Sequence, residues 1–381
     1  MKAIRNSTIL YLELITGLAL IALVLSDVFQ SVVLPRRTNS IFRLAPHLLL
    51  LLWPIWRKLG LRLHPAWRRE DFLGTFAPLA ILLLLAVWFV TLLCGFGFIL
   101  EALADQVRPP VDGFSTAFYV AGTSLLTIGY GDYVPTALPA RLVVLLAGSS
   151  GLTILALVIS LAFNLYSSFG RREVLVLLLD ARAGVPPSGV MLLETYGRLG
   201  IVPRLAETFD RYELWTAEML DSHLAYPLLP FFRSSHDGQS WVSALGAVLD
   251  AATLLTTTVP QDTCKRDESL CIARASAEMM YSIGCHALVD LTQLPVARLR
   301  ISFDDTNPGI ERAEFETACR QLAEAGYPTE ASDATWQAFS ERRAVYATRL
   351  NLLARFFASP PTQWIGDRTL LVQRHWPHFQ H

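Results

Sequence analysis

Two long uncharged segments dominate the pattern of hydrophobic and polar positions. Residues 76–100 and 142–169 contain no charged side chain over 25 and 28 positions. As helices rising 1.5 Å per residue, both are long enough to cross a hydrocarbon core of about 30 Å. We expect a third span at 9–34, although Glu13 and Asp27 interrupt it. That stretch is too long for the apolar part of a signal peptide, and no small-residue cleavage site follows it.

The segment between the first and second spans has a different character. Its apolar stretch at 41–56 is short and is bracketed by Pro46 and Pro54, which favours a helix lying along the membrane interface. Eight Arg and Lys residues lie between positions 35 and 71. Cytoplasmic loops carry such an excess of positive charge. The pattern therefore predicts a multi-pass protein of the cell membrane, with the N-terminus outside, three crossings, and everything after Gly170 in the cytoplasm.

The second half is typical of a helical cytoplasmic domain. Apolar residues recur at spacings of three and four, and Gly- and Pro-containing turns separate the periodic segments. The expected helices are 171–182, 191–199, 204–225, 241–257, 267–294, 311–325 and 333–358. The predicted fold class is an all-α membrane protein.

Composition agrees with this division. Hydrophobic types make up 52% of the chain and charged types 17%, against about 25% charged in soluble domains. The formal net charge of -1 gives no indication of nucleic-acid binding. Residues 1–169 hold 12 basic and 8 acidic side chains, and residues 170–381 hold 20 and 25. The five cysteines include no C-x-x-C pair, and no zinc-ligand spacing is present.

The chemistry is concentrated between the two long spans. A semi-polar stretch at 114–126, expected to be a short helix, precedes the string Thr127-Ile128-Gly129-Tyr130-Gly131-Asp132. Irregular backbone at membrane depth is tolerated where it lines a protein-enclosed or watery path. Glycines at alternate positions allow positive φ angles, so neighbouring carbonyls can face one axis. A row of carbonyls of this kind can replace the water shell of a monovalent cation.

This six-residue string, between two spans and after a short helix, resembles the signature of the potassium channel family. The resemblance covers residues 76–169. It implies K⁺ sites formed by the carbonyls of Thr127, Ile128, Gly129 and Tyr130 and by the Thr127 hydroxyl, with K⁺ as the permeant ion and no other cofactor. It also implies a homotetramer, since one chain supplies one loop. Tyr130 favours potassium selectivity, because relatives with an acidic residue there tend to be less selective.

Two features depart from the family pattern. Leu125 and Leu126 precede the filter where Thr or Ser is common, so packing is expected to replace some bracing hydrogen bonds. The short helix has no acidic residue, which leaves only Thr123 as an expected partner for Asp132.

The last span supplies candidates for gating. Gly151 lies where the inner helix of the family usually bends, and Gly148 is close to it; a packing role for the two glycines is an equal alternative. The helical spacing places four apolar residues on one face that we assign to the cavity, with Phe163 as a hydrophobic gate. These residues are Leu152, Leu155, Ile159 and Phe163.

The predicted organisation has four parts. Residues 1–35 form an N-terminal transmembrane helix, 36–71 a basic interfacial segment, 72–170 the pore-loop channel module, and 171–381 a helical regulatory or assembly domain. The leading hypothesis is a tetrameric potassium channel in the lipid bilayer, not an enzyme, whose regulatory ligand the sequence does not identify. The alternatives are a nonselective cation channel and a membrane-anchored signalling or scaffold protein with a vestigial pore.

Overall fold

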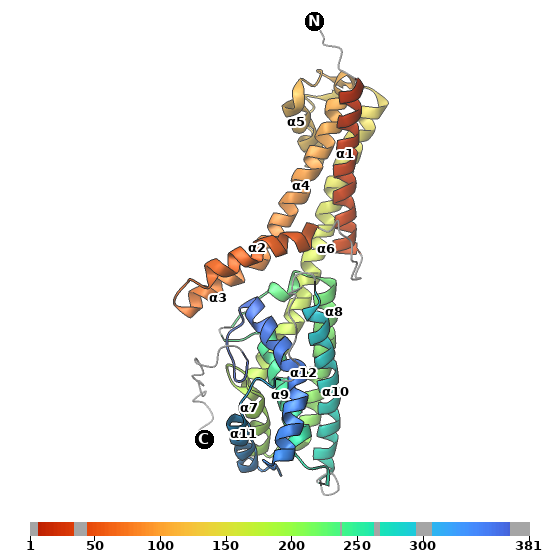
Figure 1. The fold of residues 1–381 in the computed structure, drawn as a ribbon. Coiled ribbons are helices and arrows are strands. Elements are labelled where there is room, and N and C mark those ends of the chain that lie inside the picture. The colour runs from red at the N-terminus through yellow and green to blue at the C-terminus, as the bar shows by residue number, and fades with distance from the viewer. Residues whose placement is uncertain (1–6, 34–43, 237, 263–266, 295–306, 366–381) are drawn as a thin grey trace. The chain divides into compact units, whose positions relative to one another are not determined.

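The computed structural model describes residues 7–33, 44–236, 238–262, 267–294 and 307–365. The protein is an all-α membrane protein, as predicted (Figure 1). It divides into two compact units. Unit 1 comprises Met1–Leu52 and Ala77–Tyr166, and unit 2 comprises Trp53–Phe76 and Ser167–His381.

Long apolar helices form unit 1. They are α1 (Ser7–Val28), which continues as the π-helical turn Phe29–Val33, α4 (Phe76–Ala102) and the first part of α6 (Leu138–Ala183). Three segments containing them are long and apolar enough to span a membrane: Thr8–Val32, Ala66–Ala102 and Leu138–Ala183. The short helix α5 (Gly113–Leu125) lies beside one end of α4 (Figure 1).

Small residues allow the helices of unit 1 to approach closely. A Cβ atom added to Gly17 of α1 would lie 2.6 Å from the carbonyl oxygen of Gly95 in α4. Close contact through glycine is a common way to join helices in membranes, where packing rather than the hydrophobic effect drives association. Behind this contact, Trp88, Leu92 and Phe96 of α4 belong to the buried core shared with α1, α5 and α6.

Asp27 joins the end of α1 to two other helices. Its carboxylate accepts a hydrogen bond from Trp88 Nε1 in α4 at 2.7 Å and another from the Leu44 backbone N–H at 2.8 Å. Leu44 is the first residue of α2 (Leu44–Gly60), whose leading N–H groups have no partner within the helix. Asp27 thus links the end of α1 both to α4 and to the start of α2.

A two-stranded pair closes the loop around α5. The strands β1 (Val107–Arg108) and β2 (Val134–Pro135) run antiparallel, with Val107 opposite Pro135. The 3₁₀ turn Ala104–Gln106 precedes β1, and its Gln106 carbonyl accepts a hydrogen bond from the Thr136 backbone N–H at 2.8 Å. The chain entering α5 and the chain leaving the glycine-rich string are thus tied together.

Unit 2 is a helical bundle. Its elements are the last part of α2, α3 (Ala66–Gly74), the end of α6, α7 (Gly189–Arg198), η3 (Val202–Arg204), α8 (Leu205–Ala225), η4 (Leu229–Phe231), α9 (Trp241–Thr258), α10 (Glu268–Thr292), α11 (Arg312–Glu324) and α12 (Asp333–Phe357). Side-chain caps fix several helix starts, as Ser188, Ser240 and Asp267 do for α7, α9 and α10. The expected helices match within a few residues, except that 171–182 continues α6 and forms no separate helix.

The centre of unit 2 is α9, which contacts α7, α8, α10 and α12. It is apolar enough to count as a candidate span, but 89% of that window is buried inside the unit. Asp250 of α9 accepts hydrogen bonds from Arg343 Nε at 2.9 Å and Tyr346 Oη at 2.7 Å, both on α12. Burial raises the pKa of Asp250, and its Arg343 partner opposes that effect. The buried pair fixes the register of α9 against α12, because breaking one partner would leave a buried charge.

Candidate functional site

The glycine-rich string has an alternating backbone. Thr127, Gly129 and Gly131 have φ angles of 55°, 61° and 80°, in the left-handed region, while Ile128 and Tyr130 between them do not. Alternation of positive and negative φ turns successive carbonyls toward the same side, which a regular strand does not do. The positive φ of the two glycines is confirmed. The positive φ of Thr127 was not predicted from the sequence, because threonine rarely adopts a positive φ.

The last turn of α5 holds the string in place. The Thr123 carbonyl accepts hydrogen bonds from the backbone N–H groups of Ile128 at 2.8 Å and Gly129 at 3.3 Å. Thr127 N–H donates to the Ser124 carbonyl at 3.0 Å. Carbonyls at the C-terminus of α5 thus fix the first residues of the string by accepting their N–H groups. Leu125 is buried, as expected if packing braces the string.

Asp132 has a partner that the sequence analysis missed. Tyr119 of α5 donates its hydroxyl hydrogen to Asp132 Oδ2 at 2.8 Å, and its ring lies edge-on to Tyr133. Thr123, the partner expected from the sequence, instead donates its hydroxyl hydrogen to the Val120 carbonyl at 3.1 Å. The sequence did contain a signal for this contact, because Tyr119 lies one helical turn before Thr123 on the same face of α5. Tyr119 therefore holds the Asp132 end of the string against α5.

The string lies at the surface of the single chain. All residues from Leu126 to Asp132 are exposed, and the exposed fraction of Tyr130 is 70%. A Cβ atom added to Gly129 or Gly131 would meet nothing within 4 Å. A single chain therefore covers one side of the string and leaves the other side exposed.

The predicted cavity residues share an exposed face of α6. Leu152, Leu155, Ile159 and Phe163 are 63%, 58%, 49% and 73% exposed. Bulky apolar residues exposed on one face of a helix indicate a surface that faces a cavity, lipid or another chain. The structure places the four residues together as the helical spacing predicted; their role as cavity and gate stays a prediction.

The two glycines of α6 face the end of α5. At Gly151 an added Cβ would lie 1.9 Å from the Leu125 carbonyl oxygen, and at Gly148 it would lie 3.4 Å from that of Ser124. The helix is continuous through both positions. The structure therefore shows that close packing against α5 requires a glycine at position 151. A hinge at this residue stays a prediction.

An apolar cavity of about 250 Å³ lies beside Thr127, the first residue of the string. Its walls come from α4, the end of α5 and α6, and Thr127 is among its lining residues. The other lining residues are Leu85, Phe89, Leu92, Leu125, Leu126, Gly151, Leu152, Ile154, Leu155 and Val158. The lining is mainly hydrocarbon, and Thr127 is the hydroxyl-bearing residue among the lining residues.

Unit 2 holds the continuation of α6 through a buried arginine. Arg172 is 2% exposed and donates from Nη1 to the Leu229 carbonyl at 3.2 Å and from Nη2 to the Phe232 carbonyl at 2.7 Å. Its Nη1 also lies 3.3 Å from His223 Nε2. His223 Nδ1 lies 2.7 Å from the Met219 carbonyl, which can only accept, so the proton is on Nδ1 and Nε2 accepts from Arg172. Burial, and then the positive Arg172, lower the pKa of His223 well below its usual value.

A second attachment in unit 2 involves the segment that precedes α4. Trp53 Nε1 and Arg57 Nε of α2 donate to the carbonyls of Phe356 and Arg355 at 3.0 and 3.1 Å. These carbonyls belong to the last turn of α12, where the helix dipole favours positive charge. We call this set of contacts the α12 clamp.

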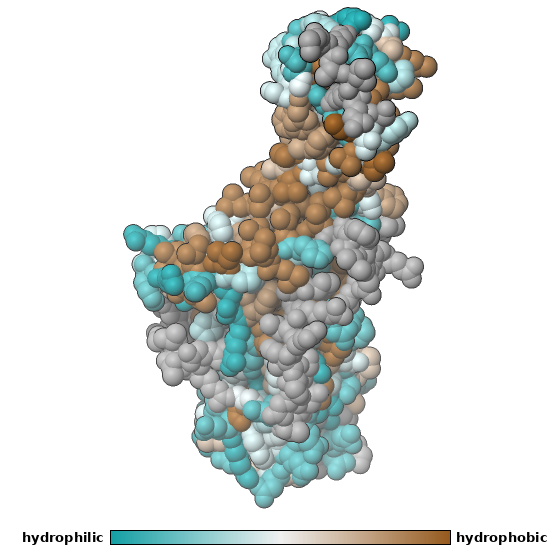
Figure 2. Space-filling model, turned by 45° about the horizontal axis from the view of Figure 1, so that its top comes forward, coloured by the Kyte–Doolittle hydropathy of each residue, from teal (hydrophilic) through white to brown (hydrophobic). Residues whose placement is uncertain are grey.

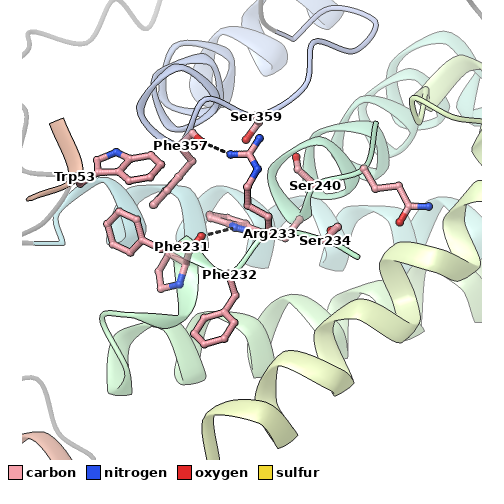
Figure 3. A pocket seen from close by; sticks show the side chains of 11 residues that line it. Trp53, Phe231, Phe232, Arg233, Ser234, Ser240, Phe357 and Ser359 are labelled. Atoms are coloured by element: carbon pink, nitrogen blue, oxygen red, sulfur yellow. Dashed lines mark hydrogen bonds between the residues drawn. The ribbon is translucent and has the colours of Figure 1, made fainter. Parts of the chain in front are cut away.

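Arg233 completes the α12 clamp. It donates to the Phe357 and Ala358 carbonyls at 2.8 Å and pairs with Glu70 of α3, Nε to Oε2, also at 2.8 Å. Figure 3 shows Arg233 reaching the Phe357 carbonyl beside the rings of Trp53 and Phe231, around a cavity of about 20 Å³. The clamp joins residues about 300 positions apart, which sequence patterns could not reveal.

Comparison with known proteins identifies one part of the chain. Residues 79–168 match a family model described as "Ion channel". This range contains α5, the glycine-rich string and the exposed face of α6, and it supports an ion-channel function in a membrane for this part of the protein. No curated protein and no solved structure matches the chain.

Proposed function

We propose that the chain is one subunit of a potassium-selective channel that conducts K⁺ passively across the cell membrane. The observation that carries this proposal is the alternating positive φ at Thr127, Gly129 and Gly131, held by hydrogen bonds to the C-terminal turn of α5. The K⁺ ligands would be the carbonyls from Thr127 to Tyr130 and the Thr127 hydroxyl. Stacked carbonyls of this kind replace the hydration shell of the ion.

Four copies would complete the pore. A single chain supplies one exposed wall of oxygens, whereas a dehydrated cation needs ligands on all sides. The exposed faces of Leu152, Leu155, Ile159 and Phe163 supply the apolar surface that a central cavity and neighbouring subunits require. The C-terminus of α5 points its dipole at the string, where negative potential favours a cation. In this proposal the N-terminus is outside and unit 2 is cytoplasmic.

Unit 2 would regulate the gate through two attachments. Arg172 anchors α6, the helix that carries Phe163, and the α12 clamp anchors the segment leading into α4. A rearrangement of η4 or of the end of α12 would therefore act on both helices that line the cavity. The proposed gate is a constriction at Phe163 that blocks ions by excluding water.

Substitution of the filter glycines tests the proposal. Gly129→Ala and Gly131→Ala force an alanine into the left-handed region, which costs about 1 kcal/mol or more and disturbs the carbonyl row. We expect loss of K⁺ flux into liposomes. Gly200→Ala is the matched control, because Gly200 has a φ of 66° and equally open surroundings, but lies in unit 2.

The outcomes separate the candidate functions. Selective K⁺ flux in the parent and in Gly200→Ala, lost in the filter variants, supports the proposal. Equal Na⁺ and K⁺ flux in the parent protein would indicate a nonselective cation channel. A correctly assembled parent protein without any ion flux would favour a membrane-anchored scaffold with a vestigial pore.

A further inference from the structure

The helix α2 has an apolar face that no described residue covers. Leu51, Ile55 and Leu59 are 66%, 57% and 47% exposed, and they follow one another at intervals of four residues, which places them on one side of the helix. The opposite face is packed, with Leu49 and Trp53 almost fully buried. A helix of 17 residues that buries one face and exposes leucines on the other is too short to cross a bilayer and has the character of an interfacial helix.

The start of α2 is fixed at the end of a membrane span. Asp27, in the last turns of the span Thr8–Val32, accepts a hydrogen bond from the backbone N–H of Leu44, the first residue of α2. The helix therefore begins where α1 leaves the hydrocarbon. Leucines exposed at that depth contact acyl chains at the boundary of the bilayer.

Cationic side chains follow the apolar face. Lys58 is exposed and lies two helical turns after Leu51, on the same side of α2. Arg62 and Arg68 are exposed in the next segment, and Arg68 lies over the ring of the exposed Trp67 at 5.1 Å. Figure 2 shows the hydrophobic colour extending along α2 and giving way to hydrophilic residues at α3.

Negative charge near these cations is limited. Glu70 is half-buried and paired with Arg233 and Arg69, so it does not compensate the three exposed cations. Asp71 is the exposed acid of α3. The surface formed by Lys58, Arg62 and Arg68 thus keeps a net positive charge. Its position beside an apolar stripe and an exposed tryptophan matches the anionic headgroup layer of a membrane.

We propose that α2 and α3 form a membrane-surface arm that binds anionic phospholipids. The leucine stripe enters the acyl boundary, and Lys58, Arg62 and Arg68 bind headgroup phosphates. The packed face of the same arm carries Trp53 and Arg57, which belong to the α12 clamp. Lipid bound at the arm is therefore sensed by unit 2, and this consequence for gating rests on the proposed channel function.

The test uses the full-length protein and a charge-matched control. In one variant Lys58, Arg62 and Arg68 are all replaced by Gln. In the control three exposed arginines elsewhere in unit 2 are replaced: Arg198→Gln, Arg211→Gln and Arg320→Gln. Native mass spectrometry measures phosphatidylglycerol retained per subunit against phosphatidylcholine, and unfolding midpoints confirm that both variants fold.

One surface charge contributes about fivefold to binding of anionic lipid, so three give on the order of 100-fold. We expect the arm variant to lose its preference for phosphatidylglycerol and the control to keep it. Equal retention by the arm variant and the parent would overturn the proposal.

A flux assay in vesicles with and without phosphatidylglycerol separates this inference from the channel itself. Dependence of K⁺ flux on phosphatidylglycerol, lost in the arm variant alone, supports the link to gating. Flux that is independent of the anionic lipid would overturn that link. Absence of flux in every lipid would refute the channel function, while lipid retention still decides the binding proposal.

Discussion

Replacement of Gly151 by alanine distinguishes a packing role from a hinge. The new Cβ would lie 1.9 Å from the Leu125 carbonyl oxygen and 2.9 Å from its carbon, so backbone atoms must move. Overpacking of this kind costs about 1–3 kcal/mol, and alanine returns up to about 1 kcal/mol of helix propensity. Because the obstacle is backbone, we place the net destabilisation near 2 kcal/mol. For a unit of this size Tm falls by about 4–8 °C.

Gly148→Ala is the matched control. Its added Cβ would lie 3.4 Å from the Ser124 carbonyl oxygen, an ordinary contact, so the propensity gain dominates and Tm stays level or rises slightly. Thermal unfolding of the purified proteins, read from a probe of the membrane helices, gives both values. Equal Tm values for the two variants would refute the packing argument. A normal Tm with changed K⁺ flux for Gly151→Ala would instead assign the residue to a hinge.

Three further predictions concern single groups. The pKa of His223 is lowered by burial and by Arg172, so unit 2 should lose stability as pH falls below about 6.5; His223→Gln should flatten this dependence in unfolding experiments. Burial raises the pKa of Asp180 to about 6, so Asp180→Asn should stabilise unit 2 at neutral pH by about 1 kcal/mol after allowance for solvent screening. That gain should vanish below about pH 4, and a pH-independent gain would contradict it. Tyr119→Phe removes the donor to Asp132, so K⁺ flux should decay faster while assembly is unchanged; an unaltered time course would contradict the brace.

Much of the fold was predictable because its signals are local. Span length defined α4 and α6, and periodicity together with capping residues located the helices of unit 2 within a few positions. The backbone at Gly129 and Gly131 was predictable because only glycine adopts positive φ readily. These inferences needed no knowledge of distant contacts.

The remaining features depend on tertiary contacts. One hydrogen-bond partner of Asp27 is a tryptophan 61 positions away, and the α12 clamp joins residues 298 and 303 positions apart. The sequence alone suggests that Arg172 is an ordinary surface charge. It is buried instead, because Leu229 of η4 and the following Phe232 supply two carbonyls to it. Hydrogen-bonding residues of this kind carry no periodic signature, so pattern analysis cannot separate them from solvent-exposed ones.

The most direct test of the central claim is an experimental density map of the full-length protein in lipid with K⁺ or Tl⁺ present. We predict four chains around one axis, with the carbonyls of Thr127, Ile128, Gly129 and Tyr130 directed at that axis and ion density between successive oxygen rings. Tyr130 side chains filling the axis, or carbonyls turned away from it with no ion density, would contradict the account.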